Sequence, residues 1–358
     1  MTVLENLTLV MPTYQRQEYA LRNMRYWSNT GVTLRVLDGS DTPIENRLLD
    51  SFGDNVIYKH DSRSLYERIE GVLSEVDTKY IALIGDDEFY IISAVESCIN
   101  ELEQDDSIVA CCGCCIGFDV DKNAGKAYGW LPYGYRNIGY NETMHDSPEE
   151  RLGGHMQNYI PTLLYGITRS HPWKAAFKIV TERKFIFFAA WELQFEMYIS
   201  FSGKAKVLKE LMWLRSNGEV EPVRCKYKGI EPEVRFKEWW GSSSKQRKEF
   251  IKVMSSAYKG EKTEISINYD NAVIHGCNSY IKGLDSLRSS RSTKVRVLFF
   301  NFIKYFIPGS FKSFLRNLLG RKRPTFLEVA DSMRERGVKV DYDNLIEIQE
   351  TIYNFHRK

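Results

Sequence analysis

Residues 80–89, which read YIALIGDDEF, decide the fold expected of this chain. An apolar run and a glycine lead directly into Asp86, Asp87 and Glu88, with no basic residue close by in the sequence to neutralise them. Such a run is typical of a buried parallel strand, and open α/β sheets bind ligands at the carboxyl ends of their strands. Adjacent carboxylates repel one another unless a cation joins them, and Mg²⁺ and Mn²⁺ prefer oxygen ligands. The stretch indicates a metal site at a sheet edge or, alternatively, a solvated acidic turn.

The composition is that of an ordinary globular protein. Of its 358 residues, 43% are hydrophobic and 27% are charged, which fits one large or two modest domains. The formal net charge of +2 gives no reason to expect a nucleic-acid partner. The N-terminal residues lack the basic and apolar segments of a signal peptide, and no apolar run approaches the ~18 residues of a membrane span. We therefore expect a cytoplasmic protein.

The cysteine pattern raises the question of a zinc site. Residues 111–115 read CCGCC and contain CxxC spacing, but no second CxxC pair exists to complete four ligands. The odd total of seven cysteines favours a reduced compartment. The run is better interpreted as small residues in a buried strand.

Strand and helix patterns alternate over roughly the first 115 residues. Apolar runs predict strands over residues 7–11, 32–37, 56–58, 80–84 and 108–112. Amphipathic spacing predicts helices over residues 18–27, 44–52, 65–76 and 91–102. This alternation predicts an α/β fold with a doubly wound, mostly parallel sheet.

The rest of the chain changes character twice. Residues 118–154 are rich in Gly, Tyr, Asn and Pro, which predicts hairpins or a long binding loop. Further along, we expect a strand over residues 162–167, a helix over 189–202 that carries Glu192 and Glu196 on one face, and strands or turns over 206–215. Helical patterns dominate after residue 231, and one or two short helices are expected after residue 325.

These patterns divide the chain into two regions. Residues 1–216 are expected to form one domain with two halves, 1–117 and 118–216. Residues 217–358 form a helical C-terminal extension with a basic, aromatic segment over 294–323. That segment is interpreted either as a peripheral membrane contact, with aromatics at the headgroup boundary and cations on anionic lipid, or as helices packed in the protein or in a homo-oligomer.

Two common nucleotide-binding motifs are missing. No GxGxxG follows the first predicted strand, and no GxxxxGK[ST] is present, so a dehydrogenase-type Rossmann fold and a P-loop ATPase are disfavoured. What remains is a nucleotide held by Asp38, after the second strand, with its phosphates held by a metal on the acidic triplet.

Four short motifs, taken in order and spacing, resemble those of family 2 and related GT-A glycosyltransferases. Residues 9–16 (LVMPTYQR) resemble the opening of that family, and residues 38–41 (DGSD) resemble its acidic turn after the second strand. The triplet at 86–88 resembles its DxD metal motif. Glu192 precedes Gly203 by eleven residues, which resembles its acidic helix. The resemblance covers roughly residues 7–216, and it implies that residues 1–216 are a catalytic domain with a nucleotide-sugar half over 1–117 and an acceptor half over 118–216.

The resemblance implies a function and a set of site residues. A sugar would move from a nucleotide-sugar donor to a hydroxyl of a glycan or lipid-linked acceptor, with inversion. Mn²⁺ or Mg²⁺ would bind Asp86, Asp87 and Glu88 and hold the diphosphate, with Asp86 toward the ribose. Glu192 would be the general base. The implied donor-binding residues are Pro12, Thr13, Tyr14, Arg16, Asp38, Arg63, Asp86 and Asp87, with Arg68 a second diphosphate candidate.

Acceptor residues are less marked in the sequence. The candidates are His155, Tyr165, Trp213 and Arg215, because aromatic faces suit sugars and arginine suits phosphate. His155 is alternatively a structural histidine and Trp213 a core residue. Two other functions remain open: a nucleotidyltransferase of sugar phosphates, or a nucleotide-sugar-binding module without catalysis. The glycosyltransferase hypothesis places the protein in the cytoplasm or on the inner face of a membrane.

Overall fold

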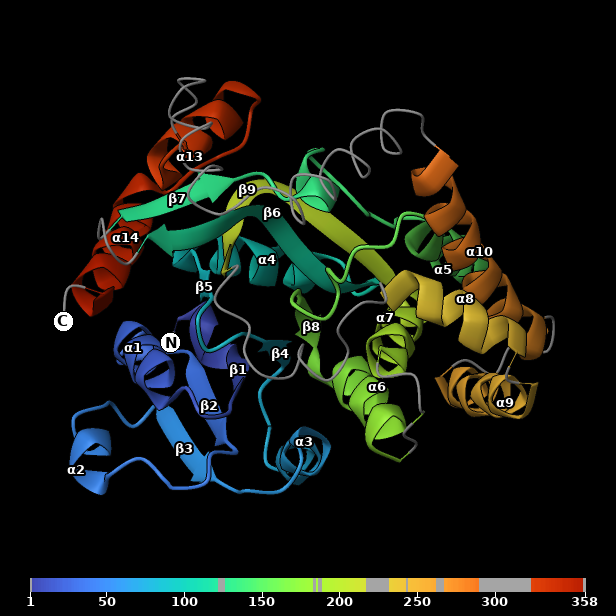
Figure 1. Cartoon of the computed structure of the whole chain (residues 1–358), viewed down its shortest axis with the longest axis horizontal. Helices are drawn as coiled ribbons and strands as arrows, with labels where there is room; N and C mark the ends of the chain where they lie inside the picture. Colours follow the sequence, from blue (N-terminus) through green and yellow to red (C-terminus); the bar gives the residue numbers. More distant parts are fainter. Residues whose placement is uncertain are drawn as a thin grey trace, which may run out of the picture.

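The computed structural model describes residues 2–121, 126–182, 185, 189–216, 232–242, 244–261, 267–289 and 323–356. Residues 294–322, which carry nearly all of the predicted membrane contact, lie outside this part. The predicted fold class is confirmed: a large, mostly parallel sheet is surrounded by helices, and helices follow it toward the C-terminus (Figure 1).

The N-terminal half follows the sequence prediction closely. A parallel array is formed by β3, β2, β1 and β4 in that order, with β1 paired to both β2 and β4. The strands are β1 Leu7–Thr13, β2 Thr33–Asp38, β3 Val56–His60 and β4 Tyr80–Leu83. The helices are α1 Gln17–Trp27, α2 Asn46–Leu49, α3 Leu65–Leu73 and α4 Ile92–Gln104, after a short 3₁₀ turn, η1 Val3–Asn6.

Successive residues of β1 enter different cores. Leu9 and Met11 pack in one hydrophobic cluster and Val10 packs in the other, as the period of two along a strand requires. Both faces of the sheet are therefore covered, which explains the continuous apolar runs that predicted these strands.

The second half of the sheet is mixed. Its strands are β5 Phe89–Tyr90, β6 Ile108–Asp121, β7 Lys126–Trp130, β8 Ile167–Arg169 and β9 Lys204–Ser216. β8 runs antiparallel between β4 and β6, whereas β6 and β9 are parallel. The buried CCGCC run lies within β6, which confirms its interpretation as small residues in a buried strand.

One strand prediction is wrong in this half, and another is confirmed in a longer form. The strand predicted over residues 162–167 is limited to Ile167, because the Glu196 carboxylate accepts hydrogen bonds from the backbone N–H groups of Leu163 and Leu164. These N–H groups are therefore unavailable to a neighbouring strand. The two separate segments predicted between residues 206 and 215 form one continuous strand, β9.

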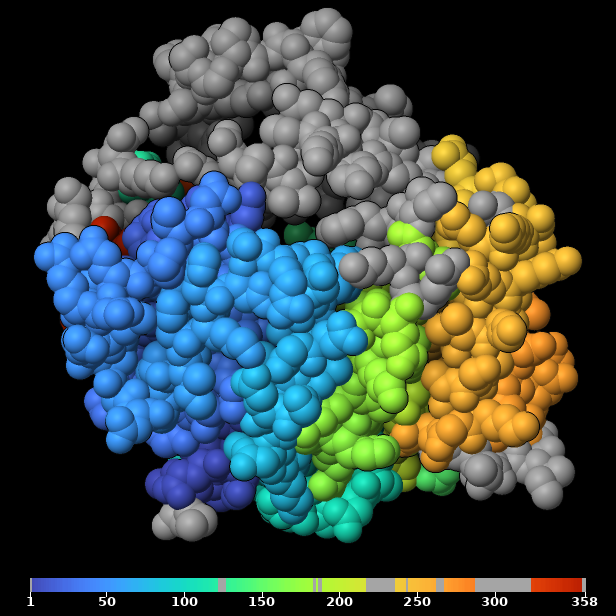
Figure 2. All heavy atoms as spheres, turned by 90° about the horizontal axis from the view of Figure 1, so that it is seen from below, coloured from blue at the N-terminus to red at the C-terminus, as the bar shows by residue number. Residues whose placement is uncertain are grey.

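Two groups of helices pack tightly beyond the sheet. The first comprises α5 Pro148–Gln157, α6 Ser170–Glu182 and α7 Ala190–Ser202, and the second α8 Pro232–Ser242, α9 Ser244–Glu261 and α10 Tyr269–Ser289. α10 lies directly against α5: a Cβ built at Gly283 would come within 2.0 Å of the Gln157 carbonyl oxygen. In Figure 2, α6 separates the N-terminal strands and helices from α8–α10.

The last two helices return to the sheet and its N-terminal helix (Figure 1). α13 Phe326–Glu335 contacts β7, and α14 Tyr342–His356 contacts α1. The Asn344 side-chain oxygen accepts hydrogen bonds from the Tyr26 hydroxyl at 3.0 Å and the Ile92 N–H at 2.9 Å. The helices predicted after residue 325 are thus confirmed. Within the described ranges, no helix combines the length and apolarity needed to cross a membrane.

Candidate functional site

The carboxyl ends of β1, β2 and β4 meet at one edge of the sheet. Thr13 and Asp38 are paired in register at the ends of β1 and β2. The Thr13 hydroxyl donates a 2.8 Å hydrogen bond to Asp86, which follows β4. The edge therefore joins three of the sequence-predicted residues, as a parallel sheet requires.

A basic side chain does neutralise two acids of the triplet, although none lies close to them in the sequence. The Arg16 guanidinium approaches Asp86 at 3.2 Å and Asp87 at 2.6 Å. Burial, followed by the charge of Asp87, nevertheless raises the pKa of Asp86 to about 7. Arg16 is 70 residues before Asp86 in the chain, but its position just after β1 places it at the same sheet edge.

Helix α1 contributes two residues that the sequence analysis missed. The Asn23 side-chain amide donates a 2.5 Å hydrogen bond to the Asp86 carbonyl oxygen. Arg22 is buried beside Phe89, and burial lowers the pKa of its guanidinium to about 10 although the Asp87 charge opposes this. Both residues lie about two turns after Arg16, a spacing that brings helical residues to the same face. This spacing is the sequence signal that could have identified them as neighbours of the site.

The third acid faces another direction. Glu88 is buried, and its carboxylate accepts a 3.1 Å hydrogen bond from the indole N–H of Trp213. Burial and then the Asp87 charge raise the pKa of Glu88 to about 8, against the opposing charge of Arg215. The guanidinium of Arg215 lies 5.6 Å from the centre of the Trp213 ring.

The triplet as it lies does not fit a divalent cation. Arg16 pairs with two of the carboxylates, while Glu88 bonds to Trp213. Among the described residues, no group of three or more His, Cys, Asp or Glu side chains is arranged to hold a metal ion. A requirement for Mn²⁺ or Mg²⁺ stays a prediction.

Asp38 organises the turn after β2. It is fully buried and accepts hydrogen bonds from Gln17 and Tyr58, each at 2.6 Å, and from the Ser40 N–H at 2.8 Å. Burial disfavours its charge, but the bonds from Ser40, Tyr58 and Gln17 outweigh it and hold the pKa of Asp38 below its ordinary value. The carboxylate therefore shapes the loop that any ligand at this edge would touch.

The two arginines proposed for the diphosphate occupy different positions. Arg63 is exposed and paired with Asp61. Arg68 is buried and donates to the carbonyl oxygens of Thr13, at 2.9 Å, and Leu37. Arg68 thus holds the ends of β1 and β2 together, whereas Arg63 remains accessible. Tyr14, at 49% exposure, is open to solvent at the same edge, and Pro12 lies within β1.

Glu192 lies in the first turn of α7 and accepts a hydrogen bond from the Tyr159 hydroxyl. Burial raises the pKa of Glu192 to about 7, while the Tyr159 bond acts in the opposite direction. Its side chain is therefore poised to gain or lose a proton near neutral pH.

Glu196, one turn later, is fully satisfied inside the protein. Its carboxylate contacts His155 Nε2 at 2.7 Å and accepts from Leu163 and Leu164, and both Glu196 and His155 are fully buried. The structure thus places His155 beneath the surface, as a partner of Glu196.

Tyr165 and Arg215 connect the acidic triplet with Glu192. The Tyr165 ring stacks on Trp213 with centroids 4.5 Å apart. Burial, followed by the charges of Glu88 and Glu192, raises the pKa of Tyr165. The positive charge of Arg215 lowers the pKa of both Glu88 and Glu192, against the effect of burial. Glu88 and Glu192 are thus both influenced by the charge of Arg215 and both influence the pKa of Tyr165.

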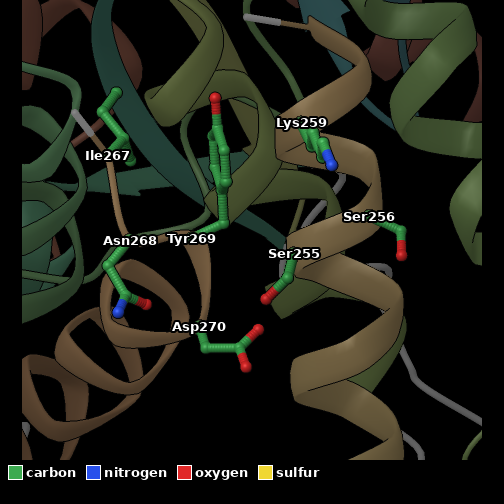
Figure 3. A pocket seen from close by; sticks show the side chains of 7 residues that line it. All are labelled: Ser255, Ser256, Lys259, Ile267, Asn268, Tyr269 and Asp270. Carbon is green, nitrogen blue, oxygen red and sulfur yellow. The ribbon is translucent and has the colours of Figure 1, made fainter. Parts of the chain in front are cut away.

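Two hollows lie among the described helices. A cavity of about 1020 Å³ has Glu192 on its wall, together with Tyr133, Asn158, Tyr159 and Tyr280. A more open hollow of about 500 Å³ lies between α9 and the start of α10 (Figure 3), lined by Ser255, Ser256, Lys259, Ile267, Asn268, Tyr269 and Asp270. The second contains none of the predicted site residues, so the larger cavity is the one relevant to the site.

Fold and site define a mixed α/β protein with buried carboxylates at a sheet edge. No family model matches the chain, and no curated protein matches it. Among solved structures, S. aureus TarS 1-349 is 12% identical, covering 81% of this chain and 92% of that one, with a TM-score of 0.44.

The same TarS fragment also matches in complex with ligands. With UDP-GlcNAc it is 11% identical over 80% of this chain and 92% of that one, with a TM-score of 0.45. With UDP the identity is 11%, the coverage 81% and 92%, and the TM-score 0.43. Likenesses of this extent establish neither family nor activity.

Proposed function

We propose that this protein is a glycosyltransferase that moves a sugar from a nucleotide-sugar donor to a hydroxyl of a glycan or glycolipid acceptor, with inversion at the anomeric carbon. The observation that carries the proposal is the position of Glu192, a half-buried carboxylate on the wall of the cavity of about 1020 Å³ that accepts a hydrogen bond from Tyr159 and whose pKa burial raises to about 7. A base near neutral pH beside a ligand-binding sheet edge is what such a transfer needs.

The donor side of the proposal uses the sheet edge. The nucleotide would lie over Thr13, Tyr14 and the turn ordered by Asp38, since these side chains end adjacent strands. Arg16 and Arg63 retain exposed surface here and would contact the diphosphate, because guanidinium groups bind phosphate oxygens strongly. Arg215 would offset charge that develops on the leaving group.

The chemical step is a single displacement. The acceptor oxygen forms a bond to the anomeric carbon while the bond from that carbon to the diphosphate oxygen breaks. The hydroxyl proton passes to Glu192, and the electron pair leaves with the nucleoside diphosphate. Tyr159 would hold the Glu192 carboxylate in place through its hydrogen bond.

Glu192→Gln tests the proposal directly. With a panel of UDP-, GDP-, dTDP- and CMP-sugars, release of nucleotide should fall by about 10²–10⁴-fold, because the amide cannot accept the proton. Nucleotide binding, measured by thermal shift, should survive. The exposed Glu70→Gln in α3 is the matched control and should leave both unchanged.

The outcome separates the competing functions. Unchanged turnover in Glu192→Gln would exclude Glu192 as the base. Formation of a nucleotide sugar from a nucleoside triphosphate and a sugar phosphate would instead favour a nucleotidyltransferase. Binding of nucleotide sugars without turnover in the unmodified chain would favour a binding module.

A further inference from the structure

The cavity of about 1020 Å³ is built by two distant parts of the chain. One wall comes from the segment between Tyr133 and Pro161, and Glu192 lies at the start of α7. The opposite wall comes from the C-terminal part of α10 through Tyr280, Gly283 and Leu284. Its volume is at the upper end of the range of about 300–1,000 Å³ for small-molecule sites, so it has room for an oligosaccharide segment.

The lining is aromatic and amide-rich. Tyr133 is 66% exposed at the cavity, and Tyr159 and Tyr280 form an edge-to-face pair with centroids 5.1 Å apart. Gln157 and Asn158 add neutral amide groups. Sugar rings pack their C–H faces on aromatic rings and exchange hydrogen bonds between their hydroxyls and amides, so this lining matches a carbohydrate.

The cavity has little cationic charge for a phosphate-rich ligand. Among its described lining residues, Arg136 is the sole arginine or lysine, and its guanidinium lies over the Tyr133 ring, 5.5 Å from the centroid. Phosphate sites normally converge several guanidinium, ammonium or backbone N–H groups.

Tyr159 links this lining to the proposed chemistry. Its hydroxyl donates to Glu192, while its ring packs on Tyr280 from α10. A ligand hydroxyl that follows the paired rings inward therefore arrives at Glu192.

We propose that this cavity is the acceptor site and that it takes a neutral, hydroxyl-rich glycan, with α10 forming one of its walls. The inference rests on the proposed function and adds the acceptor class and a contribution from the C-terminal helical region. It also differs from the sequence prediction, which placed the acceptor on His155, Tyr165, Trp213 and Arg215.

Gly154→Phe is the variant that fills the cavity. Gly154 is on the cavity wall in α5, and a Cβ built there has no heavy atom within 4 Å. Gly260→Phe in α9 is the matched control, because it is also a helical glycine with open space around its Cβ but does not line the cavity. Replacing glycine inside a helix favours helix formation, so both variants should fold.

The probes are p-nitrophenyl mono- and disaccharides, neutral and phosphorylated, with binding followed by saturation-transfer NMR. Transfer to the neutral glycosides should fall at least about tenfold in Gly154→Phe, and release of nucleoside diphosphate without acceptor, which reports transfer to water, should stay within about twofold. Gly260→Phe should match the unmodified chain in both measurements.

Each other result overturns the inference in a recognisable way. Unchanged glycoside transfer in Gly154→Phe would place the acceptor elsewhere. Binding of phosphorylated glycosides alone, or of no glycoside, would refute the neutral-glycan class. If neutral glycosides bind but no donor releases nucleotide, the proposed transferase function fails, and with it the acceptor role, although the cavity still binds sugar.

Discussion

The sheet edge and the start of α7 both bury carboxylates, but they stabilise them differently. At the edge, Arg16 pairs with Asp86 and Asp87. On α7, Glu196 is enclosed by His155 and two backbone N–H groups, whereas Glu192 has one hydroxyl partner and faces the large cavity. Residue type alone therefore does not define the role of these acids. Their partners distinguish the acids of the candidate ligand-binding edge from the structural anchor Glu196 and the candidate base Glu192.

The largest expected effect concerns the charge at the edge. If Mn²⁺ or Mg²⁺ is required, as the sequence predicts, EDTA should abolish transfer and added Mn²⁺ should restore it. A cation would have to displace Arg16 from Asp86 and Asp87, so Arg16→Gln should lower the Mn²⁺ concentration that gives half-maximal rate, while the loss of its proposed diphosphate contact should raise the KM for the donor. Transfer that resists EDTA but is lost in Arg16→Gln would show that the guanidinium serves where a metal was predicted.

The anchor role of Glu196 is tested through stability. Glu196→Gln places an amide donor near the N–H groups of Leu163 and Leu164, and each unsatisfied buried N–H costs about 1–3 kcal/mol. Urea unfolding should show this loss. Glu192→Gln keeps its Tyr159 contact and should change the unfolding midpoint far less; equal losses in the two variants would remove the contrast between them.

The base role of Glu192 predicts a pH dependence. Because the carboxylate must be ionised to accept a proton, transfer should fall below a pH of about 7. The hydrogen bond from Tyr159 lowers the pKa of Glu192, so Tyr159→Phe should move the acidic limb of the pH–rate profile to higher pH. Tyr198→Phe, which removes a hydroxyl on α7 bonded to Glu261, is the control and should leave the limb in place.

A further effect is a change of stability with pH. Burial raises the pKa of Glu88 from its ordinary 4.5 to about 8, so the folded protein holds a proton there that the unfolded chain has lost. Stability should therefore decrease as pH rises between these two values. The stability difference between Glu88→Gln and the unmodified chain, followed by thermal unfolding, should favour the variant more at pH 9 than at pH 6. An identical difference at both pH values would contradict the assignment.

The fold was largely predictable because local patterns decide most of it. The first four strands and their helices follow from apolar runs and amphipathic spacing, as at Leu9, Val10 and Met11. The failure over residues 162–166 had a long-range cause, since the competing hydrogen-bond acceptor is Glu196, more than 30 residues away. The local sequence pattern does not predict such a contact.

The candidate site was predictable where strand ends supply it. Thr13, Asp38 and Asp86 meet because parallel strands align their carboxyl ends. Arg16 was named as a donor contact, yet its pairing with the triplet depends on a three-dimensional approach. The partnership of Tyr159 with Glu192 spans 33 residues and joins the loop after α5 to α7, and no sequence motif marks it.

The close approach of α10 to α5 has a consequence for how this protein could be diversified. Because no side chain fits at Gly283, the spacing of these helices cannot be tuned by substitution there. Variation in what the cavity admits can instead arise in the segment around Tyr133, whose side chain is exposed. A library for altered substrate range should randomise that segment and leave the glycine fixed.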